Sequence, residues 1–333
     1  MGNRQSRQSK RVSKQFVKDN SSTSTDEYPP SPTDLSSRYL YVFPVDESES
    51  IRNEKQQTIA KIAWQGNFSS PIGDQLKGGG LKILDIGYAY IESSSYNNND
   101  FYQSLTHNHF RCGPGTWVSE MAETYPLCSF TGVDISPVYP LKELPENVEF
   151  IQANILDGLP IESRKFDFVV MHFLNGCFTM QQWKSIIIQE VVRVMKPGAW
   201  LEWMECNASL KNQGENTKKL VQAFLSALNS QGLNPWIVNK IPKILDHSGI
   251  FVNRQNGKRT VTYGSAAGKC GELSIDTSMN IFQAIRKQIM EFMSITPHEY
   301  DLLLDKVREE IEQYQTTMDY YRFCAQIIVV DND

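Results

Sequence analysis

Glycines and acidic residues follow two predicted strands, in a pattern typical of a nucleotide-binding turn. The apolar run 82–86 leads into Gly87, and the run 129–133 leads into Asp134. Glycine lets the backbone approach a ligand where a Cβ atom would collide. A carboxylate after the next strand can accept hydrogen bonds from both hydroxyls of a ribose. These residues predict a site for a ribose-containing cofactor.

The glycine turn is divided by a polar segment, residues 88–111, after which the sequence resumes as CGPGTW with Gly113 and Gly115. From Gly87 to Asp134 is 47 positions, and subtracting the 24 residues of the segment leaves 23. About 20 positions are expected between a glycine turn and its ribose-binding acid. The expected spacing is therefore restored only when the segment is set aside.

Four segments occur in a fixed order: ILDIG with CGPGTW, TGVDIS, FIQANILDGLP at 150–160 and VMKPGAWLEWME at 194–205. Together they resemble the class I S-adenosylmethionine-dependent methyltransferases, in particular a fungal branch with a GNFSSPI segment, here 66–72. The resemblance covers roughly 46–330. A dinucleotide-binding fold is less well supported, because the third glycine of GxGxxG is missing.

The resemblance implies a doubly wound, Rossmann-like α/β fold. Its seven-stranded sheet would be mostly parallel, with an antiparallel last strand and a helical lid at 266–318. The alternation of strands and helices independently favours a parallel sheet with helices on both faces. We expect strands at 82–86, 129–133, 148–152, 166–171, 200–204, 250–254, 258–263 and 320–330. We expect helices at 49–64, 117–125, 180–195, 218–231, 241–247, 281–294 and 297–314.

The resemblance also assigns roles to residues at the strand ends. It implies that Asp85 and the turn glycines hold the methionine part of S-adenosylmethionine, and that Asp134 holds its ribose. Many relatives have Asp where this chain has Asn154, which keeps an acceptor and adds a donor for adenine. The cofactor-binding residues implied are Asp85, Gly87, Gly113, Gly115, Asp134, Ile135, Asn154, Ile155 and Met171. The alternatives are an ordinary tight turn for the glycines and a helix cap for Asp134.

His172 is the candidate catalytic residue, since a neutral imidazole could take a proton from a hydroxyl acceptor. More often such a histidine is hydrogen-bonded and shapes the pocket. Glu202 and Glu205 follow the alternation of the fifth strand and are expected to face solvent. Five tryptophans could line an aromatic substrate pocket, but their spacing favours the core. They are Trp117, Trp183, Trp200, Trp203 and Trp236.

Composition indicates one domain after a basic, Ser-rich tail at 1–45 that is expected to be disordered. The resemblance implies that this domain, 46–333, is a methyltransferase domain. The net charge of the 333 residues is −5, which gives no reason to expect nucleic acid as a partner. Six cysteines without CxxC spacing favour a reduced, cytoplasmic protein and no metal site. No apolar run reaches the ~18 residues of a membrane span.

The first residues, MGNRQS, fit the N-myristoylation pattern at Gly2 and are followed by several Lys and Arg residues. An acyl chain and a basic segment together can hold a protein at the periphery of an anionic membrane. The alternative is a solvated basic tail. Mass spectrometry of the native N-terminus distinguishes them, because an unmodified Gly2 excludes the lipid anchor.

The function predicted from the sequence is methyl transfer from S-adenosylmethionine to a small-molecule acceptor. In-line displacement can proceed by positioning alone, without a dedicated acid or base. The alternative from another class is a catalytically inactive protein of the same fold, acting as a membrane-tethered interaction module. Cofactor binding separates the two.

We hypothesise that 88–111 is a retained intron, because a ~24-residue loop without regular structure is uncommon in a compact domain. Codon degeneracy permits a GT start at 87–88, an AG end at 110–111 and in-frame removal. We therefore expect mature transcripts that join the codons of Gly87 and Cys112. Transcript sequencing tests this, and messages that uniformly contain the segment refute it.

Overall fold

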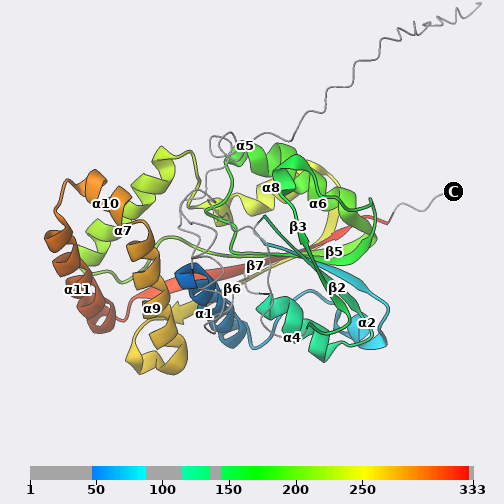
Figure 1. Ribbon diagram of the computed structural model, residues 1–333, viewed down its shortest axis with the longest axis horizontal. Coiled ribbons are helices and arrows are strands. Elements are labelled where there is room, and N and C mark those ends of the chain that lie inside the picture. The colour runs from blue at the N-terminus through cyan, green and yellow to red at the C-terminus, as the bar shows by residue number, and fades with distance from the viewer. Residues whose placement is uncertain (1–46, 88–114, 136–143, 330–333) are drawn as a thin grey trace, which may run out of the picture.

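Seven strands form one sheet in the order β3-β2-β1-β4-β5-β7-β6 (Figure 1). The computed structural model describes residues 47–87, 115–135 and 144–329. β1 to β5 are mutually parallel, and β7 is antiparallel to both β5 and β6. The predicted fold class is therefore confirmed. The strands are β1 (Lys82–Ile86), β2 (Ser129–Asp134), β3 (Val148–Gln152), β4 (Phe166–His172), β5 (Met195–Cys206), β6 (Phe251–Thr262) and β7 (Thr317–Ile327).

Helices cover both faces of the sheet and form a separate lobe at one end (Figure 1). None of the helices in the described ranges combines the length and apolar content that a membrane span requires. The α-helices are α1 (Glu47–Trp64), α2 (Gly73–Gly78), α4 (Thr116–Thr124), α5 (Met180–Gln182), α6 (Ile188–Val194), α7 (Glu215–Ser230), α8 (Ile241–Ser248), α9 (Gly268–Ala284), α10 (Arg286–Met293) and α11 (Pro297–Tyr314).

Most elements lie where the sequence predicts them, but α2 was not expected and three other regions differ. The expected helix at 180–195 contains a five-residue π-helical stretch, Trp183–Ile187, between α5 and α6. The two short strands expected at 250–263 are one long strand, β6. α9 begins at Gly268, whereas a helix was expected only from 281. α9 carries glycines and several Ser and Thr residues, and its contact with α1 outweighs that weak helix propensity.

Two apolar clusters sandwich the sheet. On one face, α2 and α4 pack on Ile83, Phe168 and Trp200. On the other, α6 and α8 pack on Leu201 and Trp203 of β5. Side chains alternate along a strand, so neighbouring residues of β5 supply both clusters. The central strands are covered on both faces, and their carboxyl ends are left as the edge at which ligands can approach.

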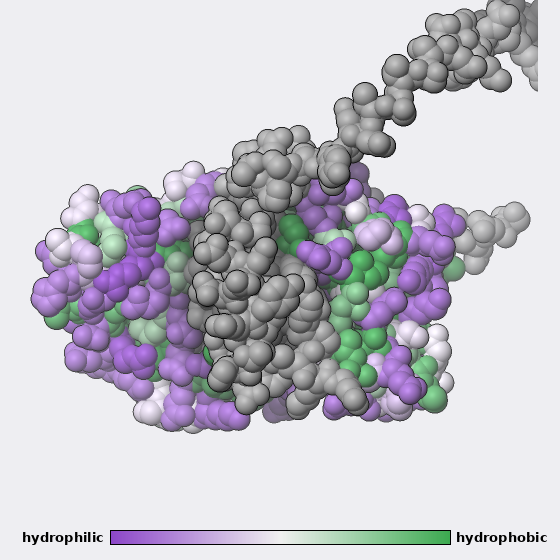
Figure 2. All heavy atoms as spheres, viewed as in Figure 1, coloured by the Kyte–Doolittle hydropathy of each residue, from purple (hydrophilic) through white to green (hydrophobic). Residues whose placement is uncertain are grey.

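A third apolar cluster joins the helical lobe to the sheet. α7, α9, α10 and α11 enclose it together with Ile59 of α1 and Tyr320 of β7. β6 and β7 are long enough to leave the central sheet and reach this lobe (Figure 1). The outer surface of the lobe is mostly hydrophilic in the view of Figure 2. The lobe therefore packs on strands that continue from the central sheet and shares an apolar cluster with them.

A buried ion pair crosses from β5 to β7. Arg322 Nε lies 3.4 Å from Glu202 Oε1, and the two side chains are 2% and 0% exposed. The Glu202 carboxylate also accepts the backbone N–H groups of Ser69 at 2.8 Å and Ser70 at 2.7 Å. Arg322 Nη2 donates to the carbonyl of Gly66 at 3.0 Å. The pair therefore fixes the GNFSSPI segment against the middle of the sheet.

Replacing Arg322 by Met should destabilise the fold strongly. We expect the free energy of unfolding to fall by about 3–5 kcal/mol, because the Glu202 carboxylate stays buried without its cation. The control is Lys77→Met, which breaks an exposed pair with Asp74 at the same 3.4 Å separation and should leave stability unchanged. Chemical denaturation measures both variants. Equal stability of the two would contradict a structural role for the buried pair.

Candidate active site

The carboxyl ends of β1, β2 and β4 meet beside β1, where the strand order reverses. Ile86 of β1 pairs with Val133 of β2 and Met171 of β4. This register brings together the next residues along each strand, Gly87, Asp134 and His172. Three of the predicted site residues thus converge at the position where doubly wound sheets bind ligands.

Two glycines make this edge accessible to a ligand. The Gly87 amide donates to the Val133 carbonyl at 2.9 Å, and a Cβ atom at 87 would lie 2.8 Å from Asp134 Oδ2. Gly115 has φ of 39°, in the left-handed region that favours glycine. Helix α4 begins directly after it at Thr116, so Gly115 occupies the N-cap position. Gly113, and the lipidation candidate Gly2, lie outside the described residues.

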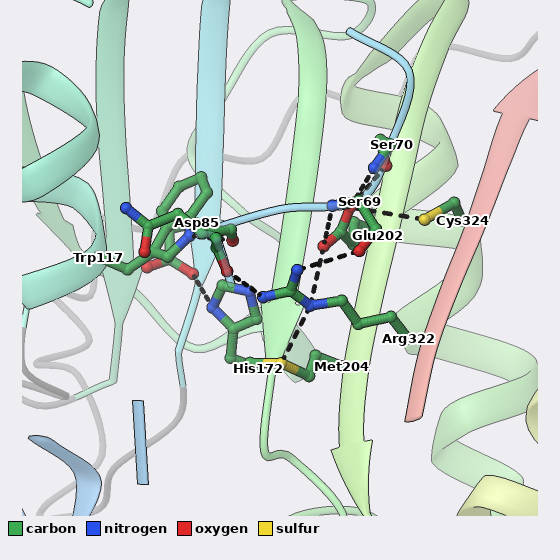
Figure 3. Close-up of polar contacts among 11 residues, drawn as sticks. Ser69, Ser70, Asp85, Trp117, His172, Glu202, Met204, Arg322 and Cys324 are labelled. Carbon is green, nitrogen blue, oxygen red and sulfur yellow. Dashed lines mark hydrogen bonds and ion pairs between the residues drawn. The ribbon is translucent and has the colours of Figure 1, made fainter. Parts of the chain in front are cut away.

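Asp85, His172 and Trp117 form a cluster at this edge, in which His172 and Trp117 are buried and the Asp85 side chain is 20% exposed (Figure 3). His172 Nδ1 lies 3.8 Å from Asp85 Oδ1. The Trp117 ring meets the imidazole edge-on, with 5.3 Å between ring centroids. Neither ring nitrogen of His172 has a hydrogen-bond partner among the described residues. A buried polar side chain without such a partner is uncommon and indicates a place where a ligand can supply one.

Burial disfavours the charged forms of Asp85 and His172. Burial, with a further contribution from Asp134, raises the pKa of Asp85 to about 7. Burial and the charge of Arg322 lower the pKa of His172 to about 3. His172 is therefore neutral at physiological pH, and its contact with Asp85 is not an ion pair. Such a low pKa makes it a weak general base, because catalytic efficiency is best when the pKa lies near the operating pH.

The adenine-binding residues predicted from the sequence lie around the ends of β2 and β3. Ile135 directly follows β2 and packs against the apolar core. Asn154 accepts the Leu156 amide at 3.0 Å and donates to Asp157 at 2.8 Å. Ile155 is buried at 2% exposure. The Asn154 side chain therefore caps a short 3₁₀ turn, and the Ile155 side chain belongs to the core.

Met171 and four of the five tryptophans are also core residues. Met171 is fully buried between β1 and β5. Trp117, Trp183, Trp200 and Trp203 are at most 6% exposed, which confirms the core assignment for them. Trp236 is 36% exposed and donates to Ser209 Oγ at 3.0 Å.

The expectation that Glu202 and Glu205 face solvent is wrong, because both are fully buried. The Glu205 carboxylate accepts the amides of Leu174 at 2.8 Å and Asn175 at 3.2 Å, and the Trp203 indole N–H at 2.9 Å. Burial raises its pKa to about 8. The sequence did not reveal that Glu202 and Glu205 are buried hydrogen-bond acceptors. A glutamate at every second or third position of a strand looks like a residue on a solvent-exposed face.

A cavity lies between the end of the sheet and the helical lobe. Residues just after β4 and β5 line it together with parts of α1, α7 and α9. Two of them, Phe173 and Asn175, lie in the loop that follows His172 at the end of β4. The sequence did not predict this cavity, because its wall comes from seven separate segments of the chain.

Several known methyltransferases are similar in sequence to parts of this chain. Residues 110–198 match a family model described as a methyltransferase domain. Methyltransferase str2 of Strobilurus tenacellus is 22% identical over 174 residues, which are 49% of this chain and 60% of str2. N-methyltransferase verN of Clonostachys rogersoniana is 24% identical over 222 residues, covering 64% of this chain and 75% of verN.

Protein-methionine methyltransferase laeA of Emericella nidulans is 30% identical over 94 residues, 28% of this chain and 24% of laeA. This chain thus spans 60% of the length of str2 and about a quarter of laeA. Among solved structures, phosphoethanolamine N-methyltransferase 2 of Haemonchus contortus in complex with S-adenosyl-L-methionine aligns at a TM-score of 0.43 and 16% identity, over 82% of this chain and 56% of that chain. The matched domain and these relatives support the predicted class I S-adenosylmethionine-dependent methyltransferase.

Replacing Asp85 by Asn should remove a pH dependence of stability. The folded-state pKa of about 7 exceeds the ordinary value of 3.8, so folding takes up a proton between these values and stability falls as the pH rises through them. We expect Asp85→Asn to gain about 1–3 kcal/mol in free energy of unfolding at about pH 8 relative to the parent, and nothing below about pH 4.

Chemical denaturation at both pH values measures this difference. The control is Asp74→Asn. The Asp74 side chain is fully exposed, so this substitution should leave the pH dependence of stability unchanged. If the variant and the parent show the same dependence of unfolding free energy on pH, folding does not raise the pKa of Asp85, and the prediction is wrong.

Proposed function

We propose that this protein transfers a methyl group from S-adenosylmethionine to a small-molecule acceptor. The observation that carries the proposal is the convergence of Asp85, Gly87 and Asp134 at the strand-order reversal beside β1. The donor set suits the cofactor, because the carboxylates can accept its hydroxyl and ammonium groups and a Cβ atom at 87 would fill the space between them.

The residues at the carboxyl ends of β1, β2 and β4 would contact different parts of the bound molecules. Asp134 would accept the ribose hydroxyls, as the position after the second strand does in related folds. Asp85 would lie near the methionine part, where an ammonium group would favour its ionised form. His172, whose ring nitrogens have no hydrogen-bond partner within 47–87, 115–135 and 144–329, would position a polar group of the bound molecules. We assign it positioning rather than proton removal, because its pKa is about 3.

When bound, S-adenosylmethionine would supply a methyl group on a positively charged sulfur. The acceptor's lone pair would form the new bond to the methyl carbon while the electrons of the carbon–sulfur bond remain on sulfur, and any proton released would pass to solvent. The chain would contribute alignment and exclusion of water, which can supply much of the rate enhancement in such displacements. This fits a site whose buried groups are mostly uncharged.

The segment 88–111 bears on this proposal because it separates Gly87 from the other turn glycines. It lies outside the described residues, as does the tail at 1–45. The family match begins at residue 110, close to the end of the segment, as a divided turn would produce. Closing such a loop costs little in itself, but the turn must still be held in register for the cofactor to bind.

Calorimetric titration with S-adenosylhomocysteine tests the proposal. We expect the chain lacking 88–111 to bind it, and the Asp134→Ala variant of that chain to bind at least about tenfold more weakly after losing charge-assisted hydrogen bonds. The control is Asp74→Ala, at a fully exposed position, which should bind like the parent. Binding by the full chain as well would mean that the segment is tolerated. Absence of binding by both folded chains would contradict the proposed function.

A further inference from the structure

The loop that follows β4 begins with a strained residue. Phe173, directly after His172, has a φ of 55°, in the left-handed region that an aromatic residue rarely adopts. Backbone conformations of this kind persist only where the surrounding structure holds them, and they occur most often at functional sites. The Phe173 amide donates to the Met204 carbonyl at 2.9 Å, and its ring meets Tyr320 edge-on at 6.1 Å. The first residue beyond β4 is therefore held in an unfavourable conformation.

Glu205, near the end of β5, binds the next two residues of this loop. Its carboxyl group accepts the backbone N–H of Leu174 at 2.8 Å and that of Asn175 at 3.2 Å. Because each peptide unit is planar, binding two consecutive N–H groups restricts the backbone dihedral angles between them. The Asn175 side chain adds a further contact by donating to the Cys206 carbonyl at 3.2 Å. The loop is thus attached to β5 at successive residues.

The Glu205 side chain is itself fixed by the core. Its Oε1 atom accepts the Trp203 indole N–H at 2.9 Å as well as the Leu174 amide, whereas Oε2 accepts the longer bond from Asn175. Trp203 is fully buried and packs against Trp183 with 4.4 Å between ring centroids. Burial raises the pKa of Glu205 to about 8, so the neutral acid predominates at about pH 7. The amide oxygen of a glutamine can reproduce such an acceptor, and an apolar side chain of equal length cannot.

We propose that Glu205 is a positioning residue for methyl transfer, which acts by fixing the loop after β4 with Phe173 in its left-handed conformation. This inference rests on the proposed methyl transfer and adds to it a residue that would touch neither cofactor nor acceptor. The loop leads from His172, at the edge where the cofactor would bind, to Phe173 and Asn175 in the cavity wall. Without Glu205, Phe173 would leave the left-handed region and the loop would take several paths. A ligand binds more weakly in proportion as its binding-competent conformation is less populated.

Hydrogen exchange of the full chain, followed by mass spectrometry, tests the attachment of the loop and needs no cofactor. We expect Glu205→Met to speed exchange in the peptide that covers 173–177 by at least about tenfold, because two amides lose their acceptor. Glu205→Gln should speed it by less than about threefold, since its amide oxygen can replace Oε1. Unchanged exchange in Glu205→Met would overturn the proposal.

The matched control is Glu310→Met in α11. Glu310 also accepts two consecutive backbone N–H groups, from Asn216 at 3.0 Å and Thr217 at 2.7 Å, but these belong to α7 in the helical lobe. This variant should speed exchange at the start of α7 and leave both the 173–177 peptide and the affinity for S-adenosylhomocysteine unchanged. If it speeds exchange at 173–177 as much as Glu205→Met does, the effect is general destabilisation and the proposal is overturned.

Titration with S-adenosylhomocysteine tests the role in methyl transfer, in whichever form of the chain, with or without 88–111, binds it. We expect Glu205→Met to weaken binding by about tenfold and Glu205→Gln by less than about threefold. Adding Phe173→Asn to Glu205→Met should restore the affinity to within about threefold of the parent, because asparagine tolerates the left-handed region. A residue needed only for stability would not be rescued in this way. Parental affinity in Glu205→Met, or no rescue by Phe173→Asn, would overturn the positioning role.

A second variant carries the test if Glu205→Met does not fold. Asn175→Leu removes the bond to the Cys206 carbonyl and leaves Glu205 in place, so exchange at 173–177 should rise by at least about threefold. Unchanged exchange in this variant would overturn the proposal.

The two measurements separate this inference from the function on which it rests. If exchange follows the expected pattern but no form of the chain binds S-adenosylhomocysteine, Glu205 fixes the loop and the proposed methyl transfer fails. If the parent and Glu205→Met bind S-adenosylhomocysteine equally well, the proposed methyl transfer stands and the positioning role of Glu205 fails.

Discussion

The arrangement of the site depends on the buried pair between Glu202 and Arg322. Glu202 holds the amides of Ser69 and Ser70, and Arg322 holds the Gly66 carbonyl, so the pair anchors the segment that precedes α2. The carbonyl of Asn67 in that segment accepts the Trp117 indole N–H at 2.8 Å. Trp117 in turn packs against His172. One ion pair in the sheet thus positions the aromatic wall of the candidate site.

The same pair also shapes the electrostatics of the site. The charge of Arg322 contributes to the low pKa of His172, while burial and Asp134 hold the pKa of Asp85 near 7. A cationic group placed beside Asp85 would favour its ionised form, so the site is electrostatically suited to a positively charged cofactor.

Local sequence patterns predicted the strand ends and the site residues that directly follow them. The ends of β1 and β3 follow from short apolar runs, and the spacing of Gly87, Asp134 and His172 along successive strands brings them to one edge. Glu202 could not be read in this way, because its partner Arg322 lies 120 residues away along the chain and only folding brings them together. The cavity was missed for the same reason. The start of α9 was missed because tertiary contacts with α1 stabilise a helix of weak propensity.

The central claim is that the edge formed by β1, β2 and β4 binds the cofactor. A crystal structure of the protein grown with S-adenosylhomocysteine tests it most directly. We expect electron density for the ligand along the ends of β1 and β2, with the ribose hydroxyls on Asp134 and the methionine part beside Asp85. Density for the ligand elsewhere, or an edge closed by protein side chains, would contradict it.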